Sequence, residues 1–177
     1  MADSEHFVRE DVRAFLDMLE AMGGKGVDEV GAIEGRTQMK TLGALAEAPA
    51  RDLAVIEDLT CPGPAGDIPL RLYDAKENRG PGPCVVFIHG GGFVIGDIDV
   101  YNSLCTEIAH RLNLPVVSVE YRLAPEHPFP AAPDDCEAAA RWIASSPDEL
   151  GREITGLVIT GDSSGGNLTI VTTNQLA

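Results

Sequence analysis

Short apolar runs rich in β-branched residues recur from residue 85 onward, and segments with the composition of helices separate them. Three such runs are expected as buried strands, at residues 85–88, 116–119 and 157–160. The helices between them are expected near 99–113 and 134–145. Strands and helices that alternate in this way are typical of a parallel sheet with helices on both faces. The sequence therefore predicts an α/β fold with a mostly parallel sheet.

The segment before these runs has the pattern of helices instead. Residues 5–22 carry apolar side chains three and four positions apart, with charged residues between them, as in an amphipathic helix. A second helical stretch is expected at 36–48. Because both precede every expected strand, residues 1–48 are predicted to form a helical cap whose first helix covers a pocket, and residues 49–177 to belong to the α/β domain. That domain is expected to open with two antiparallel edge strands, at 53–59 and 68–73.

A serine between glycines follows the last expected strand. The run at 157–160 is followed by Gly161-Asp162-Ser163-Ser164-Gly165, and a helix is expected from Ser164. In a G-x-S-x-G turn the serine stands at a sharp strand-to-helix corner, where larger flanking side chains would collide with neighbouring backbone. Ser163 is therefore predicted to be a nucleophile, which needs a base and an anion-stabilising site beside it. The residues expected to support the turn are Gly161, Asp162, Gly165 and Gly166.

A run of three glycines follows the strand expected at 85–88. Its sequence is His89-Gly90-Gly91-Gly92-Phe93. Consecutive glycines allow a backbone to approach a substrate closely and to direct amide groups toward one point, as an oxyanion hole requires. The amides expected to form this hole are those of Gly91, Gly92 and Ser164. His89 and Gly90 are expected to hold the loop in place.

A third segment completes a resemblance to a known family. Residues 121–132 have the sequence YRLAPEHPFPAA, and with the glycine run and the serine turn they occur in the order and spacing of the hormone-sensitive lipase family, which the chain resembles. The members of that family are α/β-hydrolase carboxylesterases, many of them bacterial. The resemblance implies a serine carboxylesterase that hydrolyses short-chain acyl esters through an acyl-enzyme on Ser163, without a cofactor or a metal. It leaves both a monomer and a homodimer open.

The resemblance also implies an aspartate and a histidine after the serine in the chain. Residues 164–177 contain neither, so both are expected from sequence beyond residue 177, together with the remaining C-terminal strands and helices of the fold. Asp134 and Asp135 are expected to cap a helix instead of taking part in catalysis. The histidines of the chain all precede Ser163, and none is expected to be the catalytic base. His6 is expected in the first helix and His110 late in a helix as a partner of its dipole, while His89 and His127 are expected in loops that support the site.

The balance of charges excludes several other classes of protein. Thirteen Lys and Arg against 28 Asp and Glu give the 177 residues a net charge of −15, and such a field repels nucleic acid and anionic membranes. The acidic N-terminus does not have the pattern of a signal peptide or a membrane anchor. The four cysteines are widely spaced and are expected to be reduced and buried. A cytoplasmic protein is therefore expected.

Two other functions agree with parts of this pattern. Gly90, Gly92 and Gly96 have a spacing near that of a dinucleotide-binding loop. Glu120 would be its ribose ligand, but the next helix is expected only near Asp99, and a pyrophosphate needs a helix N-terminus directly at the loop. A non-catalytic protein that binds a small molecule is the stronger alternative, because plant gibberellin receptors resemble the same family without the catalytic histidine. The intact glycine run favours the enzyme.

Overall fold

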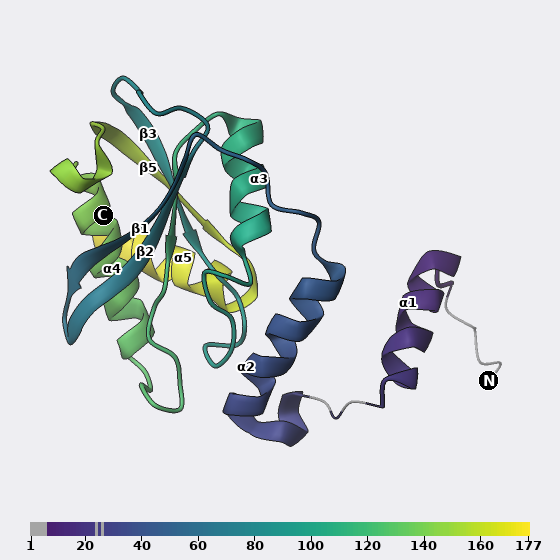
Figure 1. Cartoon of the computed structure of the whole chain (residues 1–177). Helices are drawn as coiled ribbons and strands as arrows, with labels where there is room; N and C mark the ends of the chain where they lie inside the picture. The colour runs from purple at the N-terminus through teal and green to yellow at the C-terminus, as the bar shows by residue number, and fades with distance from the viewer. Residues whose placement is uncertain (1–6, 24, 26) are drawn as a thin grey trace.

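The computed structural model describes residues 7–23, 25 and 27–177 of the chain (Figure 1). Its five-stranded sheet consists of β1 (Val55–Gly63), β2 (Gly66–Asp74), β3 (Gly82–Ile88), β4 (Val116–Val119) and β5 (Ile154–Gly161). The order across the sheet is β1-β2-β4-β3-β5. β2 is antiparallel to both of its neighbours, whereas β4, β3 and β5 are parallel, so β2 alone runs against the other strands. The predicted mostly parallel sheet, with an antiparallel pair at one edge, is confirmed.

Helices cover both faces of this sheet. α3 (Asn102–Leu112) packs on one face, and α4 (Ala131–Ala144) and α5 (Ser163–Leu176) pack on the other (Figure 1). Along β3, Val85 belongs to the core cluster on the α3 side and Val86 to the cluster on the side of α4 and α5. Successive residues of a strand face opposite sides, so a strand buried on both faces needs a continuous apolar run.

The start of α4 differs from the prediction. The helix begins at Ala131, so Asp134 lies within its first turn and Pro130, not an aspartate, precedes the helix as its N-cap. Asp135 is buried, and its carboxylate accepts hydrogen bonds of 2.8 and 2.7 Å from the Arg122 guanidinium. The prediction that both aspartates cap α4 is therefore wrong. Asp135 instead ties α4 to the loop that follows β4.

The N-terminal segment contains α1 (Glu10–Ala21) and α2 (Val27–Ala46). No residue of α1 is buried, and α1 stands apart from the sheet (Figure 1), so its apolar stripe is not part of the core described above. That this stripe covers a pocket stays a prediction. α2 begins earlier than the predicted start at 36, and it has a kink at Gly31, whose φ of +77° suits a residue without a side chain. His6, which was expected in the first helix, lies outside the described residues.

The cysteines and the helices give two further observations. All four cysteines are free and buried, as predicted, and burial raises the pKa of each thiol: Cys61, Cys84, Cys105 and Cys136. Among the helices of the described residues, none combines the length and the apolar composition that crossing a bilayer requires.

Candidate active site

Ser163 occupies the corner between β5 and α5. Its φ is +50°, a left-handed conformation that residues other than glycine rarely adopt, and the residue is exposed. The corner packs closely against the end of β3, because a Cβ at Gly161 or at Gly165 would collide with the carbonyl oxygen of Ile88. The flanking glycines are therefore required by the close approach of two backbones. The corner presents the Ser163 hydroxyl at the carboxyl end of the parallel strands.

The glycine run begins the segment that leaves β3, which we call the glycine loop (residues 89–98). Gly91, Gly92 and Phe93 are consecutive left-handed residues, with φ of +116°, +62° and +63°. The Gly91 carbonyl accepts the amides of Val94 at 3.1 Å and Ile95 at 2.9 Å, which closes the turn. In the part of the chain that the structure describes, the amides of Gly91 and Gly92 donate to no protein acceptor. Both amides are thus available to an anion.

Asp162 joins the serine corner to the glycine loop, although it lies 72 residues from Gly90 in the sequence. Its carboxylate accepts the Gly90 amide at 2.9 Å and the Tyr101 hydroxyl at 3.0 Å. The Ser164 amide lies in the first turn of α5, where a helix offers no acceptor of its own. Two adjoining backbone segments therefore carry the amides predicted for the oxyanion hole, which are those of Gly91, Gly92 and Ser164.

His89 lies beneath the glycine loop and is fully buried. Its ring stacks on Tyr121 with the ring centroids 4.3 Å apart, and the Tyr121 hydroxyl donates to the His89 carbonyl at 2.8 Å. Burial lowers the pKa of His89, so the imidazole is neutral near pH 7. Its Nδ1 lies 2.7 Å from the Gly90 carbonyl, and no partner for Nε2 is found among the described residues. The His89 side chain therefore contacts the backbone of the loop, and its supporting role stays a prediction.

A family model identifies the family to which this chain belongs. A model of the α/β-hydrolase fold matches residues 85–177, which include both the glycine run and the serine corner. The chain belongs to the α/β-hydrolase fold family. Its curated relatives identify the branch within that family, because they confirm the resemblance to bacterial carboxylesterases of the hormone-sensitive lipase family.

Two of these relatives show how far the similarity extends. The chain is 42% identical to esterase LipI of Mycobacterium tuberculosis over 118 residues, which is 66% of this chain and 37% of the relative. It is 35% identical to the ethyl acetate hydrolase of Pseudomonas putida over 174 residues, which is 94% of this chain and 55% of the relative. The chain therefore spans between about one third and about half of the length of these curated relatives.

Solved structures show the same relation. An ester-hydrolase from the metagenome of Lake Arreo, EH1AB1, has a TM-score of 0.88 at 35% identity over 96% of this chain and 55% of the other. A hyperthermophilic esterase from the archaeon Pyrobaculum calidifontis has a TM-score of 0.85 at 34% identity, over 96% of this chain and 54% of the other. The architecture described above is thus shared with both esterases over nearly all of this chain.

The two other histidines that the structure describes in this α/β-hydrolase are exposed. His110 is in the last turn of α3, as predicted for a residue that interacts with the helix dipole. His127 is in the loop before α4, where its amide donates to the Leu123 carbonyl at 2.9 Å. Among the described residues, no histidine forms a hydrogen bond with Ser163.

An apolar cavity of about 320 Å³ lies beside Gly92. The sequence did not predict it, because its walls come from the glycine loop, the loop after β4 and two helices. A site of this kind can bury the apolar part of a small ligand. Its lining residues are Gly92, Phe93, Arg122, Ala124, His127, Pro128, Phe129, Ala132, Pro133, Asn167, Leu168 and Val171.

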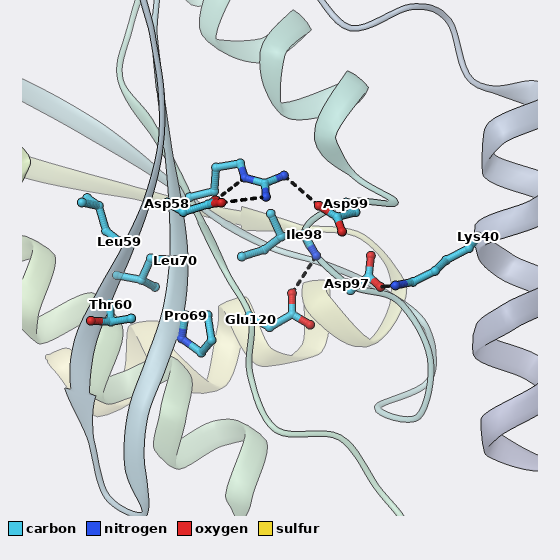
Figure 2. A pocket seen from close by; sticks show the side chains of 11 residues that line it. Lys40, Asp58, Leu59, Thr60, Pro69, Leu70, Asp97, Ile98, Asp99 and Glu120 are labelled. Carbon is cyan, nitrogen blue, oxygen red and sulfur yellow. Dashed lines mark hydrogen bonds and ion pairs between the residues drawn. The ribbon is translucent and has the colours of Figure 1, made fainter.

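A second, more polar pocket of about 500 Å³ lies where the glycine loop ends (Figure 2). Glu120 points into it and accepts the Ile98 amide at 2.7 Å, and burial raises the pKa of this carboxyl to about 7. Glu120 thus holds the loop, and α3 begins only at Asn102, so the glycines lack the helix N-terminus that a dinucleotide site needs. In the described part of the chain, no group of three or more His, Cys, Asp or Glu residues is placed to hold a metal ion.

Proposed function

We propose that this chain carries the nucleophile and the oxyanion hole of a serine carboxylesterase. The observation that supports this most directly is the hydrogen bond from the Gly90 amide to Asp162, which ties the glycine loop to the serine corner. The corner exposes the Ser163 hydroxyl, and the adjoining segments carry amides without protein acceptors. These are the two components that acyl transfer from an ester requires besides a base.

In the proposed reaction the Ser163 oxygen attacks the carbonyl carbon of an ester while its proton passes to a histidine. The amides of Gly91, Gly92 and Ser164 stabilise the negative oxygen of the tetrahedral intermediate. The intermediate collapses as the alcohol leaves with the proton from the imidazolium, and an acyl-enzyme on Ser163 remains. Water then attacks the acyl-enzyme by the same route and releases the carboxylic acid.

The aspartate and the histidine of the triad are proposed to come from sequence beyond residue 177. The described histidines support this, because His89 is buried beneath the loop while His110 and His127 lie in other elements. The α/β-hydrolase chain order, in which the acid and the histidine follow the serine, supports it as well.

The proposed substrates are short-chain acyl esters. One relative is an ethyl acetate hydrolase by name, and the apolar cavity of about 320 Å³ beside Gly92 has room for a small acyl or alcohol group. We further propose that the protein acts in the cytoplasm, since four free, buried thiols suit a reducing compartment.

The test uses the full-length protein and its Ser163→Ala variant, with a fluorophosphonate probe and p-nitrophenyl acetate as reagents. The wild type should form an adduct that maps to Ser163, and the variant should lose both the adduct and ester turnover without unfolding. Ser145→Ala, at the exposed end of α4, is the matched control and should retain both. Turnover that survives in Ser163→Ala would refute the proposal. Binding of esters by the wild type without an adduct would favour the non-catalytic alternative.

A further inference from the structure

One face of α2 lies along the outside of the glycine loop and the turn that follows it. Lys40 forms an ion pair with Asp97 at 2.7 Å, and it reaches from α2 to the loop in Figure 2. One turn further along, a Cβ at Gly43 would lie 3.8 Å from the Val100 side chain. Arg36 lies one turn before Lys40, on the same face of the helix. α2 therefore contacts the segment that carries the proposed oxyanion hole, whereas α1 has no buried residue.

Arg36 makes several hydrogen bonds to residues outside α2. Its Nε donates to the Val94 carbonyl at 2.8 Å, and its Nη2 donates to the Ala124 carbonyl at 2.9 Å. Both terminal nitrogens also bind the Glu126 carboxylate, at 3.0 and 2.7 Å. These hydrogen bonds hold the pKa of Glu126 at about 2, so the pair is ionised near pH 7. One guanidinium thus joins α2 to two separate loops.

The two loops that Arg36 joins are also joined to each other. The Ala124 amide donates to the Phe93 carbonyl at 2.8 Å, next to the Val94 carbonyl that Arg36 binds. The Val94 amide in turn donates to the carbonyl of Gly91, at 3.1 Å. Only two hydrogen bonds therefore separate the guanidinium from the backbone of Gly91. The same two loops form walls of the apolar cavity.

We propose that Arg36 is a positioning residue, which acts from α2 to hold the glycine loop in the conformation that directs the Gly91 and Gly92 amides toward the substrate. A planar guanidinium can donate in several directions at once, which a lysine ammonium on a flexible stem cannot do with the same geometry. The consequence for catalysis rests on the proposed function. The effect on the loop does not, so the two can be tested separately.

The experiment compares Arg36→Met with the matched control Arg51→Met in the full-length protein. Arg51 also pairs with a glutamate across elements, Glu107, but it does not touch the glycine loop. Amide hydrogen exchange should be faster by about tenfold at Val94, Ile95 and Ala124 in Arg36→Met, with no change in the amides of β3. If the wild type hydrolyses p-nitrophenyl acetate, kcat should fall by about tenfold in Arg36→Met while KM changes less than about twofold.

A second variant separates geometry from charge. Arg36→Lys keeps the positive charge near Glu126 but loses the planar guanidinium that donates in several directions. Hydrogen exchange at the amides of Val94, Ile95 and Ala124 should therefore still be faster than in the wild type. Unchanged exchange in Arg36→Met, equal acceleration in β3, or the same local effect in Arg51→Met would each overturn the proposal. A wild type without ester turnover would remove the proposed function, while the exchange data would still decide whether Arg36 holds the loop.

Discussion

The glycine loop is held from two sides, and the two sets of contacts differ in kind. On the side of the α/β body, the Tyr121 hydroxyl binds the buried His89 backbone, and Glu120 binds the Ile98 amide. On the side of the cap, the side chains that bind the loop are Arg36 and Lys40 of α2, which are 27% and 55% exposed. Water can replace a hydrogen bond on the exposed side, but it cannot reach a buried partner without disrupting the packing.

This difference assigns the two sides different roles. Loss of a contact on the body side leaves a backbone group without a partner and changes where the loop lies. When a contact on the cap side is lost, water replaces the side chain as the hydrogen-bond partner of the loop. The loop then keeps its position but explores more conformations around it. We therefore expect substitutions on the body side to have the larger effects, and the cap side to adjust the loop.

The largest effect is expected for Asp162→Ala, because this carboxylate links the loop directly to the serine corner. The variant removes the acceptors of the Gly90 amide and the Tyr101 hydroxyl. Loss of a properly placed oxyanion donor typically lowers turnover by about 10² to 10³-fold, and we expect a fall of about 10²-fold in kcat for p-nitrophenyl acetate. Asp52→Ala, at an exposed position, is the control and should leave kcat unchanged. A fall of less than about threefold in Asp162→Ala would contradict this role.

A smaller effect, on stability, is expected for Glu120→Gln. Burial, helped by the nearby Asp97 and Asp99, raises the pKa of Glu120 from its usual 4.5 to about 7, against the opposing effects of the Ile98 amide hydrogen bond and of Lys40. Between pH 4.5 and 7 the Glu120 carboxyl is ionised in the unfolded chain but still protonated in the folded protein. The free energy of unfolding therefore falls as the pH rises through this window. The glutamine, which keeps an acceptor for the Ile98 amide, removes this loss.

We expect Glu120→Gln to melt about 2 to 4 °C above the wild type at pH 8 and at the same temperature as the wild type at pH 4. Differential scanning calorimetry at the two pH values is the measurement. Glu57→Gln, at an exposed position of β1, is the control and should melt with the wild type at both. A difference that is equal at pH 4 and pH 8 would show that Glu120 does not titrate in this range.

The sequence predicted the body side of the site better than the cap side. The strands, the serine corner and the glycine run are local patterns, in which each residue type is required by the backbone next to it. A Cβ at Gly165 would collide with the carbonyl oxygen of Ile88, for example, so this position requires glycine. Its presence in the sequence therefore predicts the turn before the fold is known. The same holds for β3, because a strand buried on both faces needs an uninterrupted apolar run.

The cap side depends on contacts that leave no local pattern. α1 has the clearer apolar stripe, yet none of its residues is buried, and Phe15 and Leu16 are exposed. α2 is held by polar side chains instead, and Arg36 binds partners 58 and 88 residues away, at Val94 and Ala124. The role of Asp135 is hidden from the sequence for the same reason, since its partner Arg122 lies in the loop after β4. Apolar periodicity cannot find such pairs.

The smallest effect is expected for Lys40→Met, which tests whether the cap acts through charge or through geometry. Lys40 is exposed and binds the loop by a single ion pair, and exposed pairs contribute about 0.2 to 1 kcal/mol, less at high salt. Asp97 would keep its hydrogen bond from the Val100 amide, at 2.9 Å, so the loop would lose little order. We expect kcat to change by less than about twofold, against about tenfold for Arg36→Met. If kcat fell equally in Lys40→Met and Arg36→Met, and if salt changed both losses in the same direction, the positive charge of α2 would matter and the planar geometry of the Arg36 guanidinium would not.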